Sequence, residues 1–184
     1  MAKAKRPGLR KLVAMCPHMR RIQKEYGSPP PRVSEPGFDV LLRIIVDQQV
    51  SVHAGAAIWR RLEEGLGKVT PVTVLEAGDG GLRACGFSGA KSRYGTGLAE
   101  AIVTGELDLD NMHRKSDEKA QAELVKIKGI GRWTAEIYLM FALGRADLWP
   151  AGDLAVAAAA GHLLGLEKRP TPAELDEIGE RWRP

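Results

Sequence analysis

One carboxylate in this sequence of 184 residues stands where a reaction could use it. Asp153 directly precedes the apolar run 154–164, whose composition and spacing predict a helix. An aspartate at a helix N-terminus commonly caps backbone N–H groups that have no partner within the helix. The positive end of the helix dipole also favours the ionised carboxylate. Two roles are therefore open for Asp153, a helix cap or a catalytic carboxylate, and the cap is the more common one.

A second candidate site is the segment Gly129-Ile130-Gly131, which lies between two helical patterns. Its two glycines permit a sharp reversal of the backbone, and Ile130 between them can fill the core. The amide N–H groups at the start of the second helix would then bind an anion, such as a backbone phosphate of a nucleic acid. Lys128 and Arg132 add positive charge on either side. A Gly-x-Gly corner alone is more typical of an ordinary turn, so the interpretation depends on the longer pattern.

That longer pattern resembles a known motif. Residues 124–135, Leu-x-x-Ile-x-Gly-Ile-Gly-x-x-Thr-Ala, are similar to the helix-hairpin-helix motif of DNA-binding proteins. About twenty residues later, Pro-x-x-Asp-Leu at 150–154 resembles the Gly/Pro-Asp signature of the helix-hairpin-helix (HhH-GPD) DNA glycosylases. Residues 38–52, which end in Gln-Gln-Val-Ser-Val, are similar to an early helix and turn of the 3-methyladenine DNA glycosylase II branch. The resemblance covers roughly residues 27–184.

The resemblance implies a monofunctional glycosylase of base excision repair, which hydrolyses the N-glycosidic bond of flipped-out alkylated bases in DNA. Asp153 occupies the position of the catalytic aspartate of this family. A carboxylate there would stabilise the positive charge that develops on the sugar as the base departs, and could orient the attacking water. An alkylated purine already carries a positive charge, which makes it a good leaving group.

The resemblance also assigns residues that hold the base and the DNA. A flipped base needs a pocket, and aromatic rings suit a cationic base. Trp133 matches a pocket-lining aromatic of the family, whereas Tyr138 and Trp149 are weaker candidates because buried aromatic residues more often belong to the core. Gln49 resembles the position that fills the gap left by the flipped base, although an ordinary polar turn residue is an equal alternative. The residues expected to contact DNA are Lys128, Gly129, Ile130, Gly131, Arg132, Thr134, Gln49 and Ser51.

Two residue types narrow the class of glycosylase. Bifunctional members carry a lysine in the second hairpin helix that forms a Schiff base with the sugar, and Trp133 stands there in this sequence, so no lyase step is expected. Iron–sulfur members hold their cluster on four closely spaced cysteines, which Cys16 and Cys85 cannot supply. We expect no cofactor and no metal, other than a monovalent cation that the hairpin carbonyls could hold.

Two departures from the family pattern leave an alternative open. Gly152 stands where this branch often has an acidic residue, and the sequence ends at residues 181–184 where the family continues into a helix that helps to close the pocket. The alternative is a catalytically inactive helix-hairpin-helix DNA-binding protein. A third hypothesis is an unrelated all-α interaction protein, and it would require the match to the helix-hairpin-helix motif to arise by chance.

The elements that must position these residues are predicted to be helices. Apolar residues recur every three to four positions in 38–45 and 52–62, and no segment alternates as a strand does. Ser88 and Ser116 are predicted N-caps, and Gly95 and Gly97 within one helix each cost about 1 kcal/mol that packing must offset. We expect an all-α, two-lobed helical bundle. One lobe is 38–145 with the helix-hairpin-helix, and the other combines 1–37 with 146–184 and carries Asp153, the cleft between them facing the hairpin.

The amino-acid composition is compatible with a globular DNA-binding protein, but it does not by itself indicate this class. A share of 44% hydrophobic and 27% charged residues is typical of a globular protein. The net charge of +4 permits a polyanionic partner, but Lys3, Lys5, Arg6 and Arg10 supply much of it, as a solubilising tail or as an arm on phosphates. Apolar runs are shorter than the roughly 18 residues of a membrane span. We expect a monomer bound to double-stranded DNA that contains damaged bases, cytoplasmic and nucleoid-associated in a bacterium or nuclear in a eukaryote.

Overall fold

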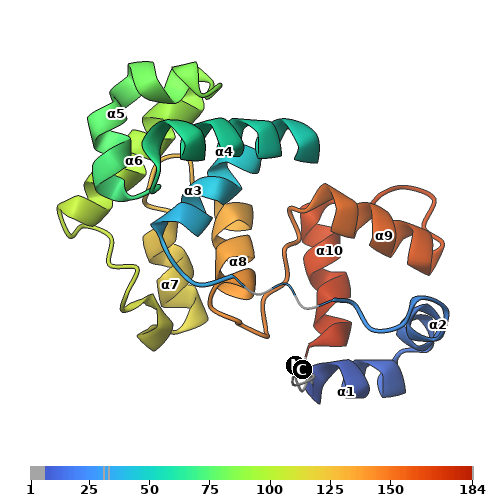
Figure 1. Cartoon of the computed structure of the whole chain (residues 1–184). Coiled ribbons are helices and arrows are strands. Elements are labelled where there is room, and N and C mark those ends of the chain that lie inside the picture. Colours follow the sequence, from blue (N-terminus) through green and yellow to red (C-terminus); the bar gives the residue numbers. More distant parts are fainter. Residues whose placement is uncertain (1–6, 31, 33, 184) are drawn as a thin grey trace. The chain divides into compact units, whose positions relative to one another are not determined.

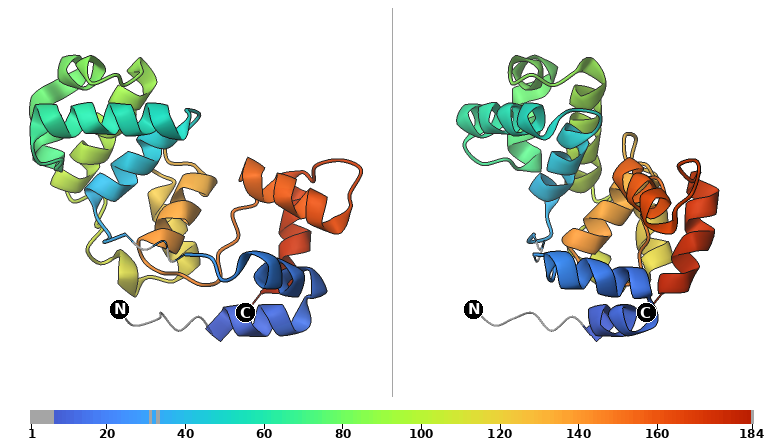
Figure 2. Two further views of the ribbon diagram at one scale, coloured as in Figure 1. Left: turned by 45° about the vertical axis from the view of Figure 1, so that its right-hand side comes forward. Right: turned by 90° about the vertical axis from the view of Figure 1, so that its right-hand side faces the viewer.

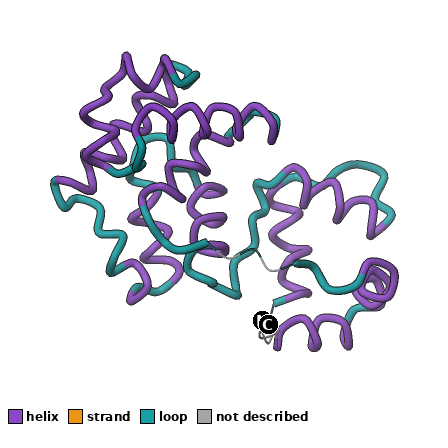
Figure 3. Tube along the Cα trace, in the orientation of Figure 1, coloured by secondary structure: helices purple, strands orange, loops and turns teal. Residues whose placement is uncertain are grey.

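The computed structural model describes residues 7–30, 32 and 34–183, which form helices joined by loops (Figure 1). No strand occurs within those ranges (Figure 3). The all-α class expected from the helical periodicity is therefore confirmed. The basic residues Lys3, Lys5 and Arg6, interpreted as a tail or a phosphate-contacting arm, lie outside the described ranges.

The helices follow one another along the chain with short connections. The bounds of those in the described ranges are α1 Pro7–Met15, α2 Pro17–Tyr26, α3 Phe38–Asp47, α4 Val52–Leu66, α5 Pro71–Ala84, α6 Gly89–Val103, α7 Asp117–Leu124, α8 Arg132–Phe141, α9 Leu154–Leu164 and α10 Pro172–Gly179, with short 3-10 helices η1 at Met112–Arg114 and η2 at Glu180–Trp182. No helix in the described part of the chain combines the length and apolar character needed to span a bilayer.

Residue contacts divide the chain into two compact units. The hairpin unit is Ser34–Gly144 and holds α3 to α8. The terminal unit combines Met1–Val33 with Arg145–Pro184 and holds α1, α2, α9 and α10. The cleft expected between two lobes stays a prediction.

Within the hairpin unit, α3 supplies the central apolar face. It packs on α4, α6 and α8, while α5 lies beside α6 and α7 beside α8 (Figures 1 and 2). Gly95 of α6 is buried against α3, since a Cβ at this position would lie 3.1 Å from Cδ1 of Leu42. Close packing of the two helices therefore offsets the low helix propensity of this glycine. The fully buried residues of α3 are Leu41, Leu42, Ile45 and Val46.

Hydroxyl side chains begin several of these helices. Ser88 accepts a hydrogen bond from the backbone N–H of Lys91 at 3.2 Å, and Ser116 accepts one from Lys119 at 3.4 Å. Both predicted N-caps are thereby confirmed. Thr70 starts α5 in the same way, and its own N–H donates to the Thr73 hydroxyl in the reciprocal bond of a capping box.

The terminal unit has a smaller core of its own. It is built around α9 and α10, and Trp149 packs against it. The indole Nε1 of Trp149 donates to the carbonyl of Leu175 at 2.8 Å, and its ring meets Trp182 edge-on with centroids 5.6 Å apart. A Cβ at Gly179 would lie 2.6 Å from this indole, so only glycine fits there. The buried residues of this core are Ala151, Ala157, Ala160, Leu175 and Ile178.

Candidate functional site

The hairpin between α7 and α8 depends on Gly129. Its φ of +96° lies in the left-handed region, which favours glycine. A Cβ at this position would also lie 2.6 Å from Cδ2 of Tyr94, which is too close for two carbon atoms that are not bonded. Both the backbone reversal and the close approach of α6 therefore require glycine here.

The apolar residues of the motif fill the core beneath the turn. Leu124, Ile127 and Ile130 are all buried, and the N–H of Ile130 donates to the carbonyl of Ile127 at 3.0 Å. Ile130 was also expected among the DNA contacts. Because its side chain is enclosed by the core, only its backbone remains a candidate for such a contact.

The N-terminus of α8 has the form of an anion site. Gly131 is the N-cap residue, is exposed, and has no side-chain oxygen that could cap the first amide groups. A helix N-terminus presented in this way binds anions through its N–H groups and its dipole. The structure thus gives the predicted phosphate site a suitable local geometry.

The two basic residues of the hairpin differ in their surroundings. Lys128 is exposed. Arg132 holds Glu136 in an ion pair, with Nε 2.7 Å from Oε1. The Arg132 side chain is 53% exposed and that of Glu136 only 3%. The buried carboxylate therefore fixes the direction of the guanidinium and offsets part of its charge.

The turn between α3 and α4 carries the second group of predicted contacts. Gln49 is exposed and has a φ of +54°. Ser51 is also exposed, and its hydroxyl caps α4 by accepting from the N–H of Ala54 at 3.2 Å. Both side chains are thus at the surface, as a DNA contact requires, although the Ser51 hydroxyl already has a structural role.

Two residues that the sequence reasoning missed hold this turn in place. Gln48 Nε2 donates to the carbonyl of Gly129 at 3.0 Å and to the hydroxyl of Thr134 at 2.9 Å. Lys91 Nζ donates to the carbonyls of Val46 and Gln48, each at 2.7 Å. Burial lowers the pKa of the Lys91 ammonium, and the nearby Asp47 carboxylate opposes that shift. The Gln-Gln pair at 48 and 49 was the only sequence signal for these contacts.

Thr134 was also expected among the DNA contacts. Its side chain is only 2% exposed and its hydroxyl accepts the bond from Gln48, so only its backbone N–H, in the first turn of α8, remains a candidate for such a contact. The helix α8 packs against α3, and the Thr134 hydroxyl meets Gln48 at the C-terminus of α3. Thr134 therefore supports the turn and does not face solvent.

Tyr138, a weaker candidate for the base pocket, belongs to the core of the hairpin unit. Its side chain is fully buried. Loss of solvation on burial raises the pKa of its phenol to about 12, with a smaller contribution in the same direction from the Asp39 carboxylate. A ring enclosed in this way has no face open to a base, which argues against the predicted role.

The two tryptophan candidates have different environments. Trp149 is committed to the core of the terminal unit through Leu175, Gly179 and Trp182, so it too is better explained by packing. Trp133 lies in the first turn of α8, next to the anion site, and is partly exposed. Trp149 is also partly exposed, so the two tryptophans differ in what they pack against rather than in exposure, and the role of Trp133 at the base stays a prediction.

Asp153 is the N-cap of α9. Its Oδ1 accepts hydrogen bonds from the N–H groups of Ala155 at 2.8 Å and Val156 at 3.0 Å. The preceding turn is closed by the bond from its own N–H to the carbonyl of Pro150 at 2.9 Å. The carboxylate is half-buried. The capping role is thus present in the structure, and it fixes the direction of the group on which the predicted catalysis depends.

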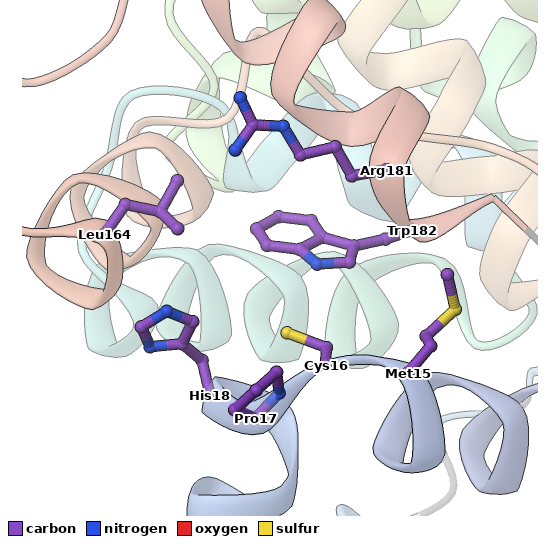
Figure 4. Close-up of a pocket in the computed structure, with 7 residues that line it drawn as sticks. All are labelled: Met15, Cys16, Pro17, His18, Leu164, Arg181 and Trp182. Atoms are coloured by element: carbon purple, nitrogen blue, oxygen red, sulfur yellow. The ribbon is translucent and has the colours of Figure 1, made fainter.

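The terminal unit also contains a cavity of about 220 Å³ (Figure 4). The thiol of Cys16 and the indole of Trp182 face each other across it. Leu164 contributes from the last turn of α9, about 16 Å along the helix axis from Asp153 at a rise of 1.5 Å per residue. The cavity is therefore separate from the candidate carboxylate. Its other lining residues are Met15, Pro17, His18 and Arg181.

Residues that could hold a metal do not gather in the described ranges, where no group of three or more His, Cys, Asp or Glu side chains has the required arrangement. Both cysteines are free thiols.

Comparison with known proteins agrees with this geometry. Residues 42–184 match the family model described as "HhH-GPD superfamily base excision DNA repair protein". DNA-3-methyladenine glycosylase 1 of Schizosaccharomyces pombe is 36% identical over 138 residues, which are 73% of this chain and 60% of that protein. The chain thus spans less than two thirds of the length of this relative.

Solved structures are similar over almost the whole chain. The S. pombe 3-methyladenine DNA glycosylase Mag1, in complex with abasic DNA, has a TM-score of 0.89 and 31% identity, covering 97% of this chain and 90% of that one. A DNA-3-methyladenine glycosidase from Bacillus halodurans has a TM-score of 0.82 and 29% identity, covering 98% and 84%. The family match covers the hairpin, Trp133 and Asp153 together, and the chain therefore belongs to the HhH-GPD superfamily of base excision DNA repair proteins.

Proposed function

We propose that the protein is a monofunctional DNA glycosylase, which hydrolyses the N-glycosidic bond of alkylated bases of the 3-methyladenine type in double-stranded DNA. One observation carries the proposal. The chain joins a hairpin whose helix N-terminus has no side-chain cap, as an anion site requires, to a carboxylate, Asp153, whose direction is fixed at another helix N-terminus. The similar proteins from S. pombe and B. halodurans are glycosylases, and none of them supports the catalytically inactive alternative.

Binding would begin at the hairpin. The amide groups at the start of α8, with Lys128 and Arg132, would hold a backbone phosphate without reading the base sequence. Gln49, exposed in the turn before α4, would fill the space left by the extruded nucleotide. Trp133 would lie against the flipped base, where an aromatic face favours a positive charge.

Asp153 would act on the bond itself. The C1′–N bond breaks with its electron pair moving to the cationic purine, which leaves as a neutral base. The sugar becomes cationic at the same time, and the carboxylate stabilises that charge more in the transition state than in the ground state. Water then adds to C1′ and releases one proton, leaving an abasic site. Trp133 stands where bifunctional members have a lysine, so no Schiff base forms and the strand is not cut.

The proposal includes the partners and setting of this reaction. The partner is double-stranded DNA that carries a damaged base, bound by a monomer. The reaction needs no cofactor, because charge stabilisation and a good leaving group suffice. A monovalent cation on the hairpin carbonyls would only support the phosphate contact. The protein would act where genomic DNA is found.

The decisive experiment measures release of free base from methylated duplex DNA. Asp153→Asn keeps the shape and the capping oxygen of the side chain but removes its charge, so excision should fall on the order of 10²-fold or more. Asp79→Asn, the same change at an exposed position of α5, is the matched control and should leave the rate unchanged. Excision by Asp153→Asn at the wild-type rate would show that the carboxylate is only a cap.

A further inference from the structure

One side chain joins the two segments of the hairpin unit that are predicted to face DNA. The turn 48–51 and the hairpin 125–131 are far apart in sequence, and Gln48 lies 81 and 86 residues from its two partners. Its Nε2 carries two N–H groups, which are directed to the carbonyl of Gly129 and the hydroxyl of Thr134. The amide thus connects the hairpin loop itself and the first turn of α8 to the end of α3.

A second contact fixes the backbone that carries Gln48. Lys91 reaches from α6 to the carbonyls of Val46 and Gln48, at the C-terminus of α3. These carbonyls have no partner within the helix, and a cation is favoured at that end of the helix dipole. The main chain at Gln48 is therefore anchored to α6 while its side chain is anchored to the hairpin.

The residue that follows is held in an unusual conformation. Gln49 has a φ of +54°, and no other non-glycine residue in the described ranges has a positive φ. L residues rarely adopt this conformation, so the surrounding contacts must maintain it. Lys91 binds the carbonyl immediately before Gln49, and Ser51 caps α4 two residues after it. The backbone from which the exposed Gln49 side chain projects is thereby held in one conformation.

We propose that Gln48 is a positioning residue, which sets the distance between the phosphate-binding hairpin and the exposed Gln49. This inference rests on the proposed glycosylase function. With the spacing fixed, binding of a phosphate at the hairpin places Gln49 at a defined step of the duplex. Loss of the two Gln48 bonds should leave phosphate binding and the chemistry at Asp153 intact but impair extrusion of the base.

The test compares Gln48→Met with Gln121→Met. Methionine keeps the length of glutamine but cannot donate a hydrogen bond, and Gln121 is a partly exposed residue of α7 in the same unit. Base release is measured from methylated DNA as a duplex and as a single strand, in which no extrusion from a stack is needed. Two hydrogen bonds of ordinary strength correspond to roughly a tenfold effect. We expect Gln48→Met to lose about tenfold on the duplex and little on the single strand, whereas Gln121→Met changes neither.

A binding readout separates this inference from the proposed function. The fluorescence of 2-aminopurine placed beside an abasic analogue rises when the protein unstacks the duplex. We expect wild type to raise it, and Gln48→Met to raise it less at saturating protein. If wild type releases no base at all, the proposed function fails, but the fluorescence still tests Gln48. Equal fluorescence for wild type and Gln48→Met, or equal losses on duplex and single strand, would overturn the inference.

A second pair of variants covers the case in which Gln48→Met does not fold. Thr134→Val removes only one acceptor of Gln48 and keeps the shape of the side chain, while Thr134→Ser retains the hydroxyl. Thr134→Val should lower duplex excision about threefold relative to single-strand excision, and Thr134→Ser should restore the wild-type ratio. A wild-type ratio in Thr134→Val would contradict the proposal.

Discussion

Substitution of Gly129 by alanine tests the reasoning about the hairpin most directly. The left-handed backbone at φ +96° costs an L residue about 1–2 kcal/mol. The added Cβ would lie 2.6 Å from Cδ2 of Tyr94, and moving that ring out of a packed site costs about 1–2 kcal/mol more. We therefore expect Gly129→Ala to lower the free energy of unfolding by about 2–4 kcal/mol, measured by urea denaturation with the m value unchanged.

Two further variants separate the components of this loss. In a Tyr94→Gly background, which removes the Cβ of residue 94 as well as the ring, the steric part disappears, so Gly129→Ala should then cost only the backbone part, about 1–2 kcal/mol. Gly131→Ala is the matched control, because φ is −88° at that position and an added Cβ would meet no atom within 4 Å. Its effect on stability should stay within about 0.5 kcal/mol.

The reasoning would be refuted by a Gly129→Ala protein that unfolds within about 0.5 kcal/mol of wild type, or by the same loss with and without the Tyr94 ring. Gly131→Ala adds a second comparison. Since it borders the anion site, it should weaken binding to duplex DNA although it leaves stability unchanged. A loss of stability in Gly131→Ala as large as in Gly129→Ala would show that neither the positive φ nor the Tyr94 ring explains the need for glycine in this turn.

Three further predictions follow from other features. Asp153→Ser should keep the stability of wild type because serine also caps helices, whereas Asp153→Ala should lose about 1 kcal/mol in thermal or urea unfolding, and both should lose base excision. For Tyr138 the folded pKa of about 12 exceeds the usual value of 10.0, so the unfolded state loses its proton first as the pH rises. Stability should accordingly fall by about 2 kcal/mol between pH 10 and pH 12, and Tyr138→Phe should fall less over that range in a pH series of urea titrations. Binding to undamaged duplex should be independent of sequence and, with about three phosphate contacts, should weaken roughly 40-fold when salt rises fourfold in a filter-binding assay, so a flat salt dependence would argue against a phosphate site.

The hairpin was predictable because its constraints are local. A glycine that must adopt a positive φ, and apolar residues three positions apart on either side, are features of a continuous segment. The N-caps Ser88 and Ser116 were predictable for the same reason, since each hydroxyl binds an N–H three residues further on. Patterns of this kind depend on the backbone geometry of one turn, which the sequence determines almost by itself.

The aromatic candidates show where local patterns fail. Tyr138 and Trp149 have side chains suited to a base, but Tyr138 is fully buried and Trp149 packs against the core of the terminal unit. For Trp149 the covering residues are Gly179 and Trp182, about thirty positions away along the chain. Helical periodicity gives the face on which a residue lies, and it does not say which other element packs against that face.

Gln48 and Thr134 show that local patterns also fail at the candidate site. Thr134 follows Trp133 directly in α8, yet the threonine is enclosed and the tryptophan is partly exposed. A rotation of about 100° between successive helical residues separates the two environments. The enclosed hydroxyl is bound by a glutamine 86 residues earlier, a pairing that no spacing rule connects. Residues that contact a ligand can thus be inferred from motifs, while those that hold them in place come from packing between distant segments. Gln48 belongs to the second kind, since its side chain binds Gly129 and Thr134 and ties the turn that carries the predicted contact Gln49 to the hairpin.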